Sequence, residues 1–373
     1  MPDFTRRNFL KTAGMGTAAF ALHEALPAMA RDSQQSSATL QPGRTSKKVI
    51  VVGAGMAGLV AAYELDRTGH NVILLEAQLR PGGRVLTLRA PFSDGLYAEA
   101  GATCIPDTHR LAIGYARQFQ LKLVPCFPPD GNFVNQIAGQ RVLGARDEVA
   151  HADAGLTTQE RNLGVKGMWE KYVSTAVRGI GDPAAPGWSP AQFSQYDSVT
   201  FARFLRQRGA SAAAVRVMLL GRDLDGVSAL RMLADLATTG NITARFKIEG
   251  GNDLLPRALA GRLSSRIHYG AWVRQIDQDN RRVQATYVQG NLKHVIEADH
   301  LICTIPFPAL RQVEFAPILS DEKIEAIQGT YYLSAASVWL QEDRRFWQAR
   351  RPRLDAGRAA ALARHFRRRI ERA

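Results

Sequence analysis

The sequence predicts an α/β fold, founded on a parallel βαβ unit near the N-terminus and divided along the chain by a helical insertion. Three observations carry this prediction. Val49–Val52 is an apolar run without a polar break, a glycine-rich turn follows it at once, and residues 155–240 have helical patterning. The chain has 373 residues, enough for more than one domain with a sizeable buried core.

The turn after this run has the glycine spacing of a phosphate-binding loop. Gly53 permits the tight turn out of the strand, Gly55 lets the backbone approach a pyrophosphate, and Gly58 lets the following helix pack closely on the sheet. Met56 and Ala57 stand between the last two glycines. Because a helix N-terminus presents unpaired N–H groups and a positive dipole end to phosphates, the pattern predicts a Rossmann-like dinucleotide site.

A second strand and an acidic residue complete the unit. Asn71–Leu75 reads as the second parallel strand, and Glu76 closes it 23 residues after Gly53. A carboxylate at this place accepts hydrogen bonds from both ribose hydroxyls of an adenosine and disfavours a 2′-phosphate. A βαβ unit that binds no dinucleotide is the alternative, and the complete context makes it the weaker one.

The next residues distinguish a flavin from a nicotinamide. Arg80-Pro81-Gly82-Gly83-Arg84 places two glycines between arginines, in a tight turn that brings cationic side chains back over the pyrophosphate. The turn resembles the second signature of the glutathione-reductase-like flavoproteins, within the branch that contains the amine oxidases. The resemblance implies that the dinucleotide is FAD, bound non-covalently.

The likeness extends from Lys47 to about Trp347. Over this length the chain is similar to the flavin amine oxidases, and most similar to the L-amino-acid oxidases. The segments that carry it are Glu76–Val85, Tyr97–Pro106 followed by His109 and Arg110, Ile248–Pro256, His268–Val273 and Leu301–Pro306.

These segments imply a set of cofactor contacts. Tyr97–Pro106 resembles the turn that passes under the isoalloxazine ring, and Ile248–Pro256 resembles the segment that re-enters the flavin domain. His268–Val273 is expected to be one strand, with the backbone of its last residue against adenine. The implied cofactor shell is Gly53, Gly55, Met56, Ala57, Gly58, Glu76, Ala77, Arg80, Arg84, Gly101, Ala102, Thr103, Cys104 and Val273.

The resemblance also divides the chain. Residues 47–104 and 245–318 are expected to be the two FAD-binding segments of one Rossmann-like, glutathione-reductase-like domain. Residues 105–154 and 319–348 are expected to belong to an incomplete α+β substrate domain. Residues 155–240 resemble the helical insertion that shapes substrate access.

Residues 1–30 read as a twin-arginine signal peptide. Arg6 and Arg7 precede Phe-Leu-Lys, the apolar run that follows is too short to span a membrane, and Ala28-Met29-Ala30 has the small-x-small pattern of a cleavage site. This route exports folded proteins, often with a cofactor already inserted. The expected location is the periplasm or the outside of the cell, with the twin-arginine machinery as a partner and residues 31–46 as a flexible linker.

Two positions depart from the L-amino-acid oxidases. Cys104 stands where they have an arginine that pairs with the substrate carboxylate, and a cysteine cannot form that bidentate pair. This departure favours an amine over an α-amino acid. Ser337 stands where the family often has a lysine that is linked to reoxidation by oxygen, so slow reoxidation is expected.

The implied reaction is the oxidative deamination of an amine or L-amino acid. A hydride passes from the carbon bearing the amine to flavin N5, the imine hydrolyses, and oxygen becomes hydrogen peroxide. The cofactor carries the chemistry and the protein orients the substrate, so no catalytic residue is assigned. The alternatives are a truncated, non-catalytic family member and a flavin monooxygenase of the tryptophan 2-monooxygenase type. A homodimer is a possible assembly.

The positive charge is concentrated at the C-terminus. Residues 349–373 supply +7, half of the formal net charge of +14. Because the charge is local and no recognition motif accompanies it, nucleic-acid binding is not expected. This Arg- and Ala-rich tail has no counterpart in the family, and a reading frame lost near Gln348, with early termination, is the favoured explanation. An amphipathic basic helix is the alternative.

The cysteines and the insertion give two smaller expectations. Cys104, Cys126 and Cys303 lie far apart, which argues against a zinc site or a disulfide framework and leaves one disulfide open for an exported protein. In the insertion, Ser198 is a plausible N-cap and Ala212–Leu220 a strong helix. The aromatic residues there could line a channel but are more often core; they are Trp169, Tyr172, Trp188 and Tyr196.

Overall fold

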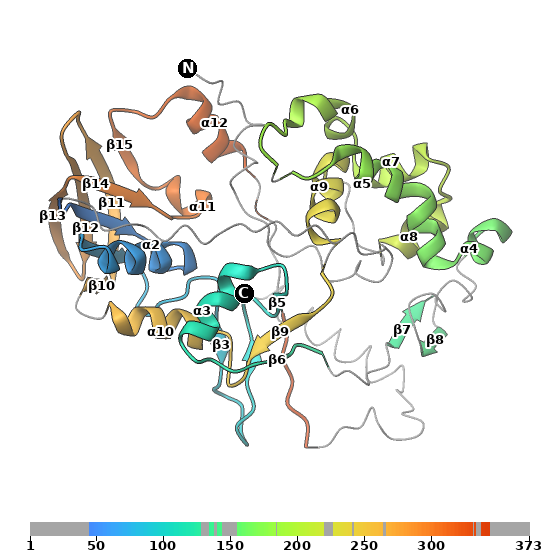
Figure 1. The fold of residues 1–373 in the computed structure, drawn as a ribbon, viewed down its shortest axis with the longest axis horizontal. Helices are drawn as coiled ribbons and strands as arrows, with labels where there is room; N and C mark the ends of the chain where they lie inside the picture. The colour runs from blue at the N-terminus through green and yellow to red at the C-terminus, as the bar shows by residue number, and fades with distance from the viewer. Residues whose placement is uncertain are drawn as a thin grey trace, which may run out of the picture.

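The chain has a mixed α/β fold in which the sheets and the helical bundle occupy separate regions (Figure 1). The structure, a computed structural model, describes residues 45–127, 134–137, 140–143, 155–183, 185–219, 227–240, 242–263, 266–330, 332 and 337–343. The signal peptide, most of the linker and the Arg-rich tail lie outside these residues. Within them, none of the helices has both the length and the apolar character needed to span a membrane.

A four-stranded parallel sheet forms the centre of the N-terminal region. Its strand order is β10-β2-β1-β14, with bounds Ile267–Tyr269, Asn71–Glu76, Lys48–Val52 and His300–Cys303. All three pairings are parallel. Val49 and His300 therefore become neighbours although about 250 residues of the chain separate them.

Strand β1 is apolar from Val49 to Val52 because both of its faces are covered there. Val49 and Val51 pack with α2 (Met56–Arg67) and α10 (Leu254–Arg262). Ile50 and Val52 point to the opposite face and pack against a second sheet. The period of two in the side-chain directions thus distributes one hydrophobic run over two cores.

The second sheet has the order β13-β12-β11-β15 and is antiparallel except for the β11–β15 pair. The bounds are Leu292–Ala298, Val283–Gln289, Ala271–Gln278 and Glu314–Ala316. The expectation of one strand over His268–Val273 was wrong. Gly270 has a φ of +71° and separates β10 from β11, which belong to different sheets.

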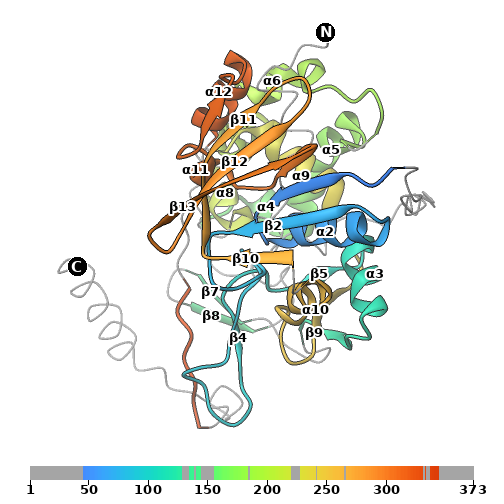
Figure 2. The same ribbon diagram turned by 90° about the vertical axis from the view of Figure 1, so that its left-hand side faces the viewer.

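Shorter elements lie outside these two sheets (Figure 2). Strands β5 (Ile105–Pro106) and β6 (Leu123–Pro125) both pair with β9 (Arg245–Ile248), and α3 (Arg110–Gln118) lies between β5 and β6 along the chain. The remaining elements are β3 (Thr87–Leu88), β4 (Ala98–Glu99), β7 (Val134–Ile137), β8 (Gln140–Leu143), α11 (Phe307–Leu310) and α12 (Asp321–Gly329).

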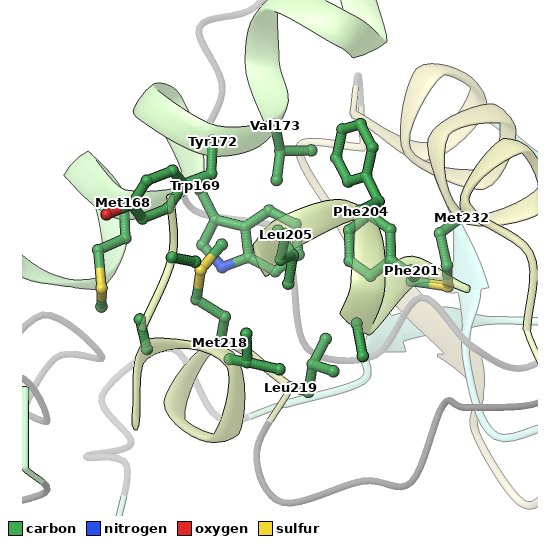
Figure 3. Packing of buried hydrophobic residues seen from close by; sticks show 14 of the residues in the cluster. Met168, Trp169, Tyr172, Val173, Phe201, Phe204, Leu205, Met218, Leu219 and Met232 are labelled. Atoms are coloured by element: carbon green, nitrogen blue, oxygen red, sulfur yellow. The ribbon is translucent and has the colours of Figure 1, made fainter. Parts of the chain in front are cut away.

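Between residues 158 and 239 the described elements are helical and share one core. Their bounds are α4 Thr158–Trp169, η3 Glu170–Ser174, α5 Thr175–Ile180, η4 Pro190–Phe193, α6 Ser194–Asp197, α7 Phe201–Gln207, α8 Ala212–Met218 and α9 Ala229–Thr239. Trp169 and Tyr172 are buried in this core, where Trp169 stacks on Phe201 (Figure 3). These two aromatic residues are therefore core and do not line a channel.

The N-cap of α7 is Thr200, so the expectation of Ser198 was wrong. The Thr200 hydroxyl accepts a hydrogen bond from Arg203 N, whereas Ser198 ends the preceding helix. The cause is a β-bridge between Thr200 and Ser228, which keeps the chain extended up to Thr200. The helix predicted from Ala212 is present as α8 over Ala212–Met218, with Leu219 as its C-cap, and Leu220 lies outside the described residues.

Glu160 links the first helix of this region to α8. The side chain is buried, and it accepts hydrogen bonds from the backbone N–H and the hydroxyl of both Thr157 and Ser211. Burial alone would raise the pKa of this carboxyl, but the four donors outweigh burial and lower the pKa below its usual 4.5.

We expect Glu160→Gln to destabilise the helical region by about 1–3 kcal/mol, because buried N–H and O–H donors lose their acceptor. The stabilisation from the ionised group is complete above the unfolded pKa of 4.5 and is lost as the pH falls through the lower folded value. Urea unfolding at neutral and acidic pH measures both effects. The Glu160→Gln variant should lose the part of the acid sensitivity that Glu160 provides. The control is Glu325→Gln, at an exposed position of α12, which should keep the acid sensitivity of the wild type. Equal acid sensitivity in Glu160→Gln and wild type would contradict the role given to Glu160.

Candidate cofactor site

The glycine-rich turn forms the end of β1 and the start of α2. Gly53 N donates to Leu75 O at 2.8 Å, so the turn closes over the neighbouring strand. A Cβ on Gly58 would lie 1.9 Å from Gly53 O, whereas a Cβ on Gly55 would meet no atom within 4 Å. Gly58 is thus required by packing, and Gly55 faces open space at the N-terminus of α2.

The second glycine turn rests directly on the first. Gly82 N donates to Ala54 O at 2.8 Å, and Gly55 and Gly82 form a parallel β-bridge. A Cβ on Gly83 would lie 3.4 Å from Gly55 Cα. Two bare stretches of backbone therefore meet at the open space in front of α2.

The two arginines of the second turn behave differently. Arg80 donates to Gly83 O at 3.0 Å and to Pro81 O at 3.3 Å, so its guanidinium braces the turn that contains it. The Arg84 side chain is exposed, and its carbonyl accepts a hydrogen bond from Ala102 N at 3.0 Å. The turn therefore has one fixed cation and one exposed cation.

Glu76 is buried at the end of β2, beside the first turn. One carboxylate oxygen accepts from Ala54 N at 2.6 Å and the other from Gln78 N at 2.7 Å. Each carboxylate oxygen has two lone pairs, so both oxygens keep acceptor capacity for a ribose hydroxyl. Ala77 follows as an exposed residue at the same edge.

The segment Gly101–Cys104 adjoins the second turn. Ala102 N binds Arg84 O, and Gly101 N donates to Leu86 O at 3.2 Å. A Cβ on Gly101 would lie 1.9 Å from Arg84 O, so only glycine permits this approach. The three segments from the sequence prediction therefore converge on one edge of the parallel sheet.

Of the other predicted residues, Met56 is half-buried and Ala57 is exposed in the first turn of α2. Val273 is buried in β11, where it packs in the same core as Ile50 and Val52. A β-bulge follows it, between Val273 and Gln275.

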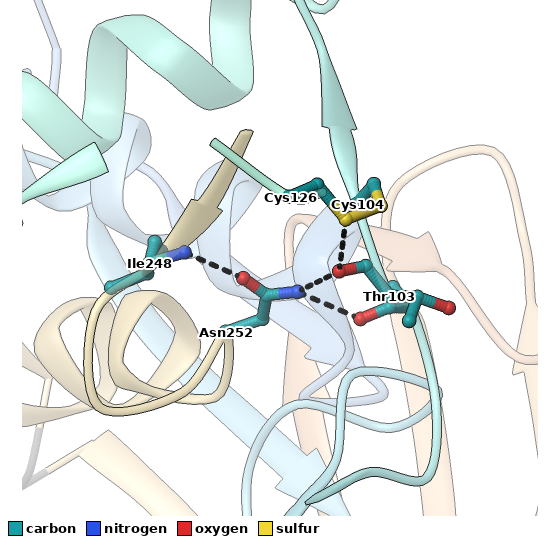
Figure 4. The surroundings of a disulfide bond; sticks show 6 residues. Thr103, Cys104, Cys126, Ile248 and Asn252 are labelled. Atoms are coloured by element: carbon teal, nitrogen blue, oxygen red, sulfur yellow. Dashed lines mark hydrogen bonds between the residues drawn. A yellow bond between two sulfur atoms is a disulfide. The ribbon is translucent and has the colours of Figure 1, made fainter. Parts of the chain in front are cut away.

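Asn252 holds the Gly101–Cys104 segment, and the sequence prediction did not include it. Its amide nitrogen donates to Ala102 O at 2.9 Å and to Thr103 O at 3.0 Å, while its amide oxygen accepts from Ile248 N (Figure 4). The side chain is 4% exposed. The sequence feature that could have indicated this role of Asn252 is its place as a polar residue directly after Gly250-Gly251, in a segment expected to return to the flavin domain.

A buried acid lies beneath this contact. Glu99 accepts hydrogen bonds from Asn252 N at 2.8 Å and from the Thr87 hydroxyl at 2.8 Å. Burial raises the pKa of Glu99, and these two donors offset only part of that rise. The carboxyl thus joins β4, β3 and the returning segment at one point.

Asp253 forms an ion pair with Arg89 next to this group. The two carboxylate oxygens accept from the two guanidinium nitrogens at 2.8 and 3.0 Å, and Arg257 also binds the carboxylate. Burial would raise the pKa of Asp253, but the Arg89 hydrogen bonds and the charge of Arg257 outweigh burial and lower the pKa. The pair fastens the loop after β3 to the start of α10.

Cys104 and Cys126 form a disulfide with a Cα–Cα distance of 5.8 Å (Figure 4). The single disulfide that the sequence left open is therefore present, and Cys303 keeps a free thiol. Among the described residues there is no cluster of His, Cys, Asp and Glu that could hold a metal ion.

Two glycine substitutions should separate the pyrophosphate site from the packing of the fold. Gly55 has a φ of −71°, which alanine adopts readily, and open space in front of it. Gly55→Ala should leave the unfolding of the cofactor-free protein unchanged and weaken FAD binding about tenfold to a hundredfold by overpacking. Gly58→Ala should destabilise the cofactor-free protein itself by about 1–3 kcal/mol or more.

FAD titration monitored by fluorescence, together with urea unfolding of the cofactor-free proteins, measures both variants. Unchanged FAD affinity in Gly55→Ala would contradict the placement of the pyrophosphate.

Two family models match the sequence. The model described as flavin containing amine oxidoreductase matches residues 56–367, and the model of the twin-arginine translocation signal matches residues 3–23. The chain therefore carries an export signal for the twin-arginine pathway, which leads to the periplasm or to secretion. The first match continues past Gln348, the point at which the sequence predicts that the likeness ends, and the interpretation of the tail stays a prediction.

Relatives and solved structures agree with the first match. The L-amino-acid oxidase of Demansia vestigiata is 30% identical over 81% of this chain and 59% of its own length, and that of Naja atra is 31% identical over 81% and 60%. Cyclohexylamine oxidase from Brevibacterium oxydans IH-35A has the same fold, with a TM-score of 0.59, 22% identity and coverage of 76% and 63%.

The chain spans about 60% of the length of these curated relatives. The family match nevertheless covers well over half of the chain. A family that contains flavin agrees with the candidate dinucleotide site formed by the two glycine turns and Glu76. The protein belongs to the flavin-containing amine oxidoreductases.

Proposed function

We propose that the chain binds FAD along the edge formed by β1, β2 and the turns that follow them, and that it oxidises an amine. The convergence of the turns at Gly53–Gly58, Arg80–Arg84 and Gly101–Cys104 supports the binding proposal. The core on each face of the parallel sheet supports a split, glutathione-reductase-like FAD domain over residues 47–104 and 245–318. Residues 105–154 and 319–348 would supply parts of the substrate domain.

The described residues have distinct roles in this proposal. The N–H groups at the start of α2 would hold the pyrophosphate over Gly55, with Arg84 supplying positive charge. Glu76 would accept hydrogen bonds from the ribose hydroxyls, and the backbone of Val273 would contact the adenine. When bound, FAD accepts the hydride from the carbon that bears the amine.

The substrate class follows from Cys104. At this position L-amino-acid oxidases have the arginine that pairs with the substrate carboxylate, and in this chain the side chain is engaged in a disulfide. A carboxylate at this point would lose its water without gaining a cationic partner. This observation carries the proposal that the preferred substrate is a primary or secondary amine without an α-carboxylate, although the two relatives described above are named L-amino-acid oxidases.

A matched pair of substrates tests this preference. 3-Methylbutylamine and L-leucine share a side chain and differ by the carboxylate. We expect the amine to bleach the visible flavin absorption under anaerobic conditions about tenfold to a hundredfold faster, because an unpaired carboxylate forfeits about 1.5–3 kcal/mol of charged hydrogen bonding. Phenylethylamine and L-phenylalanine provide a second pair with an aromatic side chain.

The products of the same reactions distinguish the alternatives. Release of an aldehyde and ammonia supports amine oxidation, whereas an amide from an amino acid would indicate a monooxygenase. Reduction of the flavin by L-leucine at the rate of the amine would overturn the substrate proposal. A flavin that neither substrate reduces would favour the non-catalytic alternative.

Ser337 is exposed and is proposed to limit reoxidation. We expect Ser337→Lys to raise the rate at which oxygen reoxidises the flavin by about tenfold or more, because a positioned proton donor assists oxygen reduction. The anaerobic rate of reduction by the amine should not change. Stopped-flow absorption separates the two half-reactions, and Ser337→Ala is the control. An equal effect of both substitutions would refute the proposed role.

A further inference from the structure

The Cys104–Cys126 disulfide ends at the flavin-side turn. Cys104 is the last residue of the Gly101–Cys104 segment, and Cys126 follows β6 directly. Cys126 N donates to Arg245 O in β9, so Cys126 is itself fixed to the strand that leads to Asn252. The turn already leads into this small β5-β9-β6 sheet through β5, and the disulfide adds a covalent link from the turn to the end of β6.

Hydrogen bonds from Asn252 also hold the turn, and they do not depend on the disulfide. The Asn252 amide binds Ala102 O and Thr103 O, immediately before Cys104. Without the disulfide, this amide still holds the middle of the turn, but its end at Cys104 has one tether fewer. Reduction should therefore loosen the turn and leave the fold in place.

A contact of Cys126 with the turn would keep the two cysteines close in the reduced protein. Cys126 Sγ lies 3.7 Å from Thr103 O (Figure 4). A disulfide sulfur has no proton, so in the oxidised protein this is only a contact. In the reduced protein the thiol can donate to the same carbonyl, which keeps Cys126 beside Cys104. Both residues are partly exposed, so a thiol oxidant can reach them.

The export signal gives the two redox states an order in time. The twin-arginine pathway carries folded proteins, and the cytoplasm, where this folding occurs, keeps thiols reduced. The disulfide would then form after export, in an oxidising compartment. FAD would enter the protein while the turn is held by hydrogen bonds alone, from the Asn252 amide and to the carbonyls of Arg84 and Leu86.

We propose that the Cys104–Cys126 pair is a redox lock on the FAD site: the dithiol form admits FAD, and oxidation after export retains it. This inference rests on the FAD site proposed above. In the closing step one chain thiolate attacks the disulfide of an oxidant, forms a mixed disulfide and expels one oxidant sulfur as a thiolate. The second chain thiolate then attacks the chain sulfur of the mixed disulfide, forms the Cys104–Cys126 bond and expels the other oxidant sulfur. The oxidant has gained two electrons, and the two protons that the chain thiols lost convert it into two thiols.

Thermodynamic linkage allows the proposed coupling to be measured in two ways, from the affinity for FAD and from the disulfide–dithiol equilibrium. If oxidation tightens FAD binding by a certain factor, FAD must favour the disulfide over the dithiol by the same factor. A disulfide that stabilises only the global fold would raise the urea midpoint without linking these two equilibria. The reciprocal effect therefore distinguishes a disulfide that is coupled to FAD binding from one that only stabilises the fold.

The experiment starts from the full chain purified with its FAD. FAD release is followed by fluorescence after dilution, before and after reduction with dithiothreitol. We expect the dithiol form to release FAD at least about fivefold faster, the lower end of typical coupling between sites. The Cys104→Ser/Cys126→Ser variant should release FAD at the dithiol rate with or without reductant, and Cys303→Ser should behave as wild type.

Equilibration of apoprotein and holoprotein with glutathione redox buffers provides the reciprocal measurement. FAD titration of the apoprotein in each redox state gives the ratio of the two dissociation constants. The disulfide-to-dithiol ratio should be larger in the holoprotein by this same factor. Equal release rates in the two redox states would overturn the lock while leaving the FAD site intact. A protein that holds no FAD in either state would overturn the FAD site and the lock together.

Discussion

The parallel pairing of β1 with a neighbour on each side is the constraint on which the candidate cofactor site depends. Val52 lies opposite Leu75 in β2 and Cys303 in β14, so the three strands end at the same level. The glycine turn, Glu76 and Thr304 follow these three ends. Thr304 donates to Val52 O at 2.7 Å and closes the edge from the far side. Carboxyl ends of neighbouring parallel strands are where α/β sheets bind ligands, because the turns there carry side chains and N–H groups into one space.

Hydrogen bonds from polar side chains hold the segments that surround the end of the parallel sheet. The segment that contains Gly101–Cys104 and the returning segment around Asn252 are joined by hydrogen bonds whose partners lie about 150 residues apart. Buried polar groups are stable only when all of their partners are present, so these contacts form together or not at all. Glu99 illustrates this condition, since its burial is tolerated through the donors from Thr87 and Asn252. The edge is therefore a property of the folded chain, which suits a protein that is exported after folding.

The parts of the fold that could be predicted from the sequence obey local rules. The glycine spacing after β1 and the acid at the end of β2 follow from what a tight turn and a ribose require of neighbouring residues. The break at Gly270 and the cap at Thr200 depend on distant pairings, with β2 and with Ser228 respectively. Ser198 is as good an N-cap by type as Thr200, and only the bridge to Ser228 decides between them. Asn252 likewise shows its role only once the carbonyls of Ala102 and Thr103 lie beside it.

The effect of Cys104 on the candidate site depends on its bond to Cys126 as well as on its residue type. As a free thiol it would be a small, weakly polar side chain, and its effect would be limited to the absence of a cation. As half of a disulfide it also constrains the backbone of the turn, because the bond joins that turn to the strand after α3. One substitution can then act on two properties at once. In the two proposals it removes the charge that would attract a carboxylate, and it adds a covalent tether that would form after export. The proposed substrate class and the proposed redox behaviour of this chain therefore depend on one residue, and a single substitution at Cys104 would affect both.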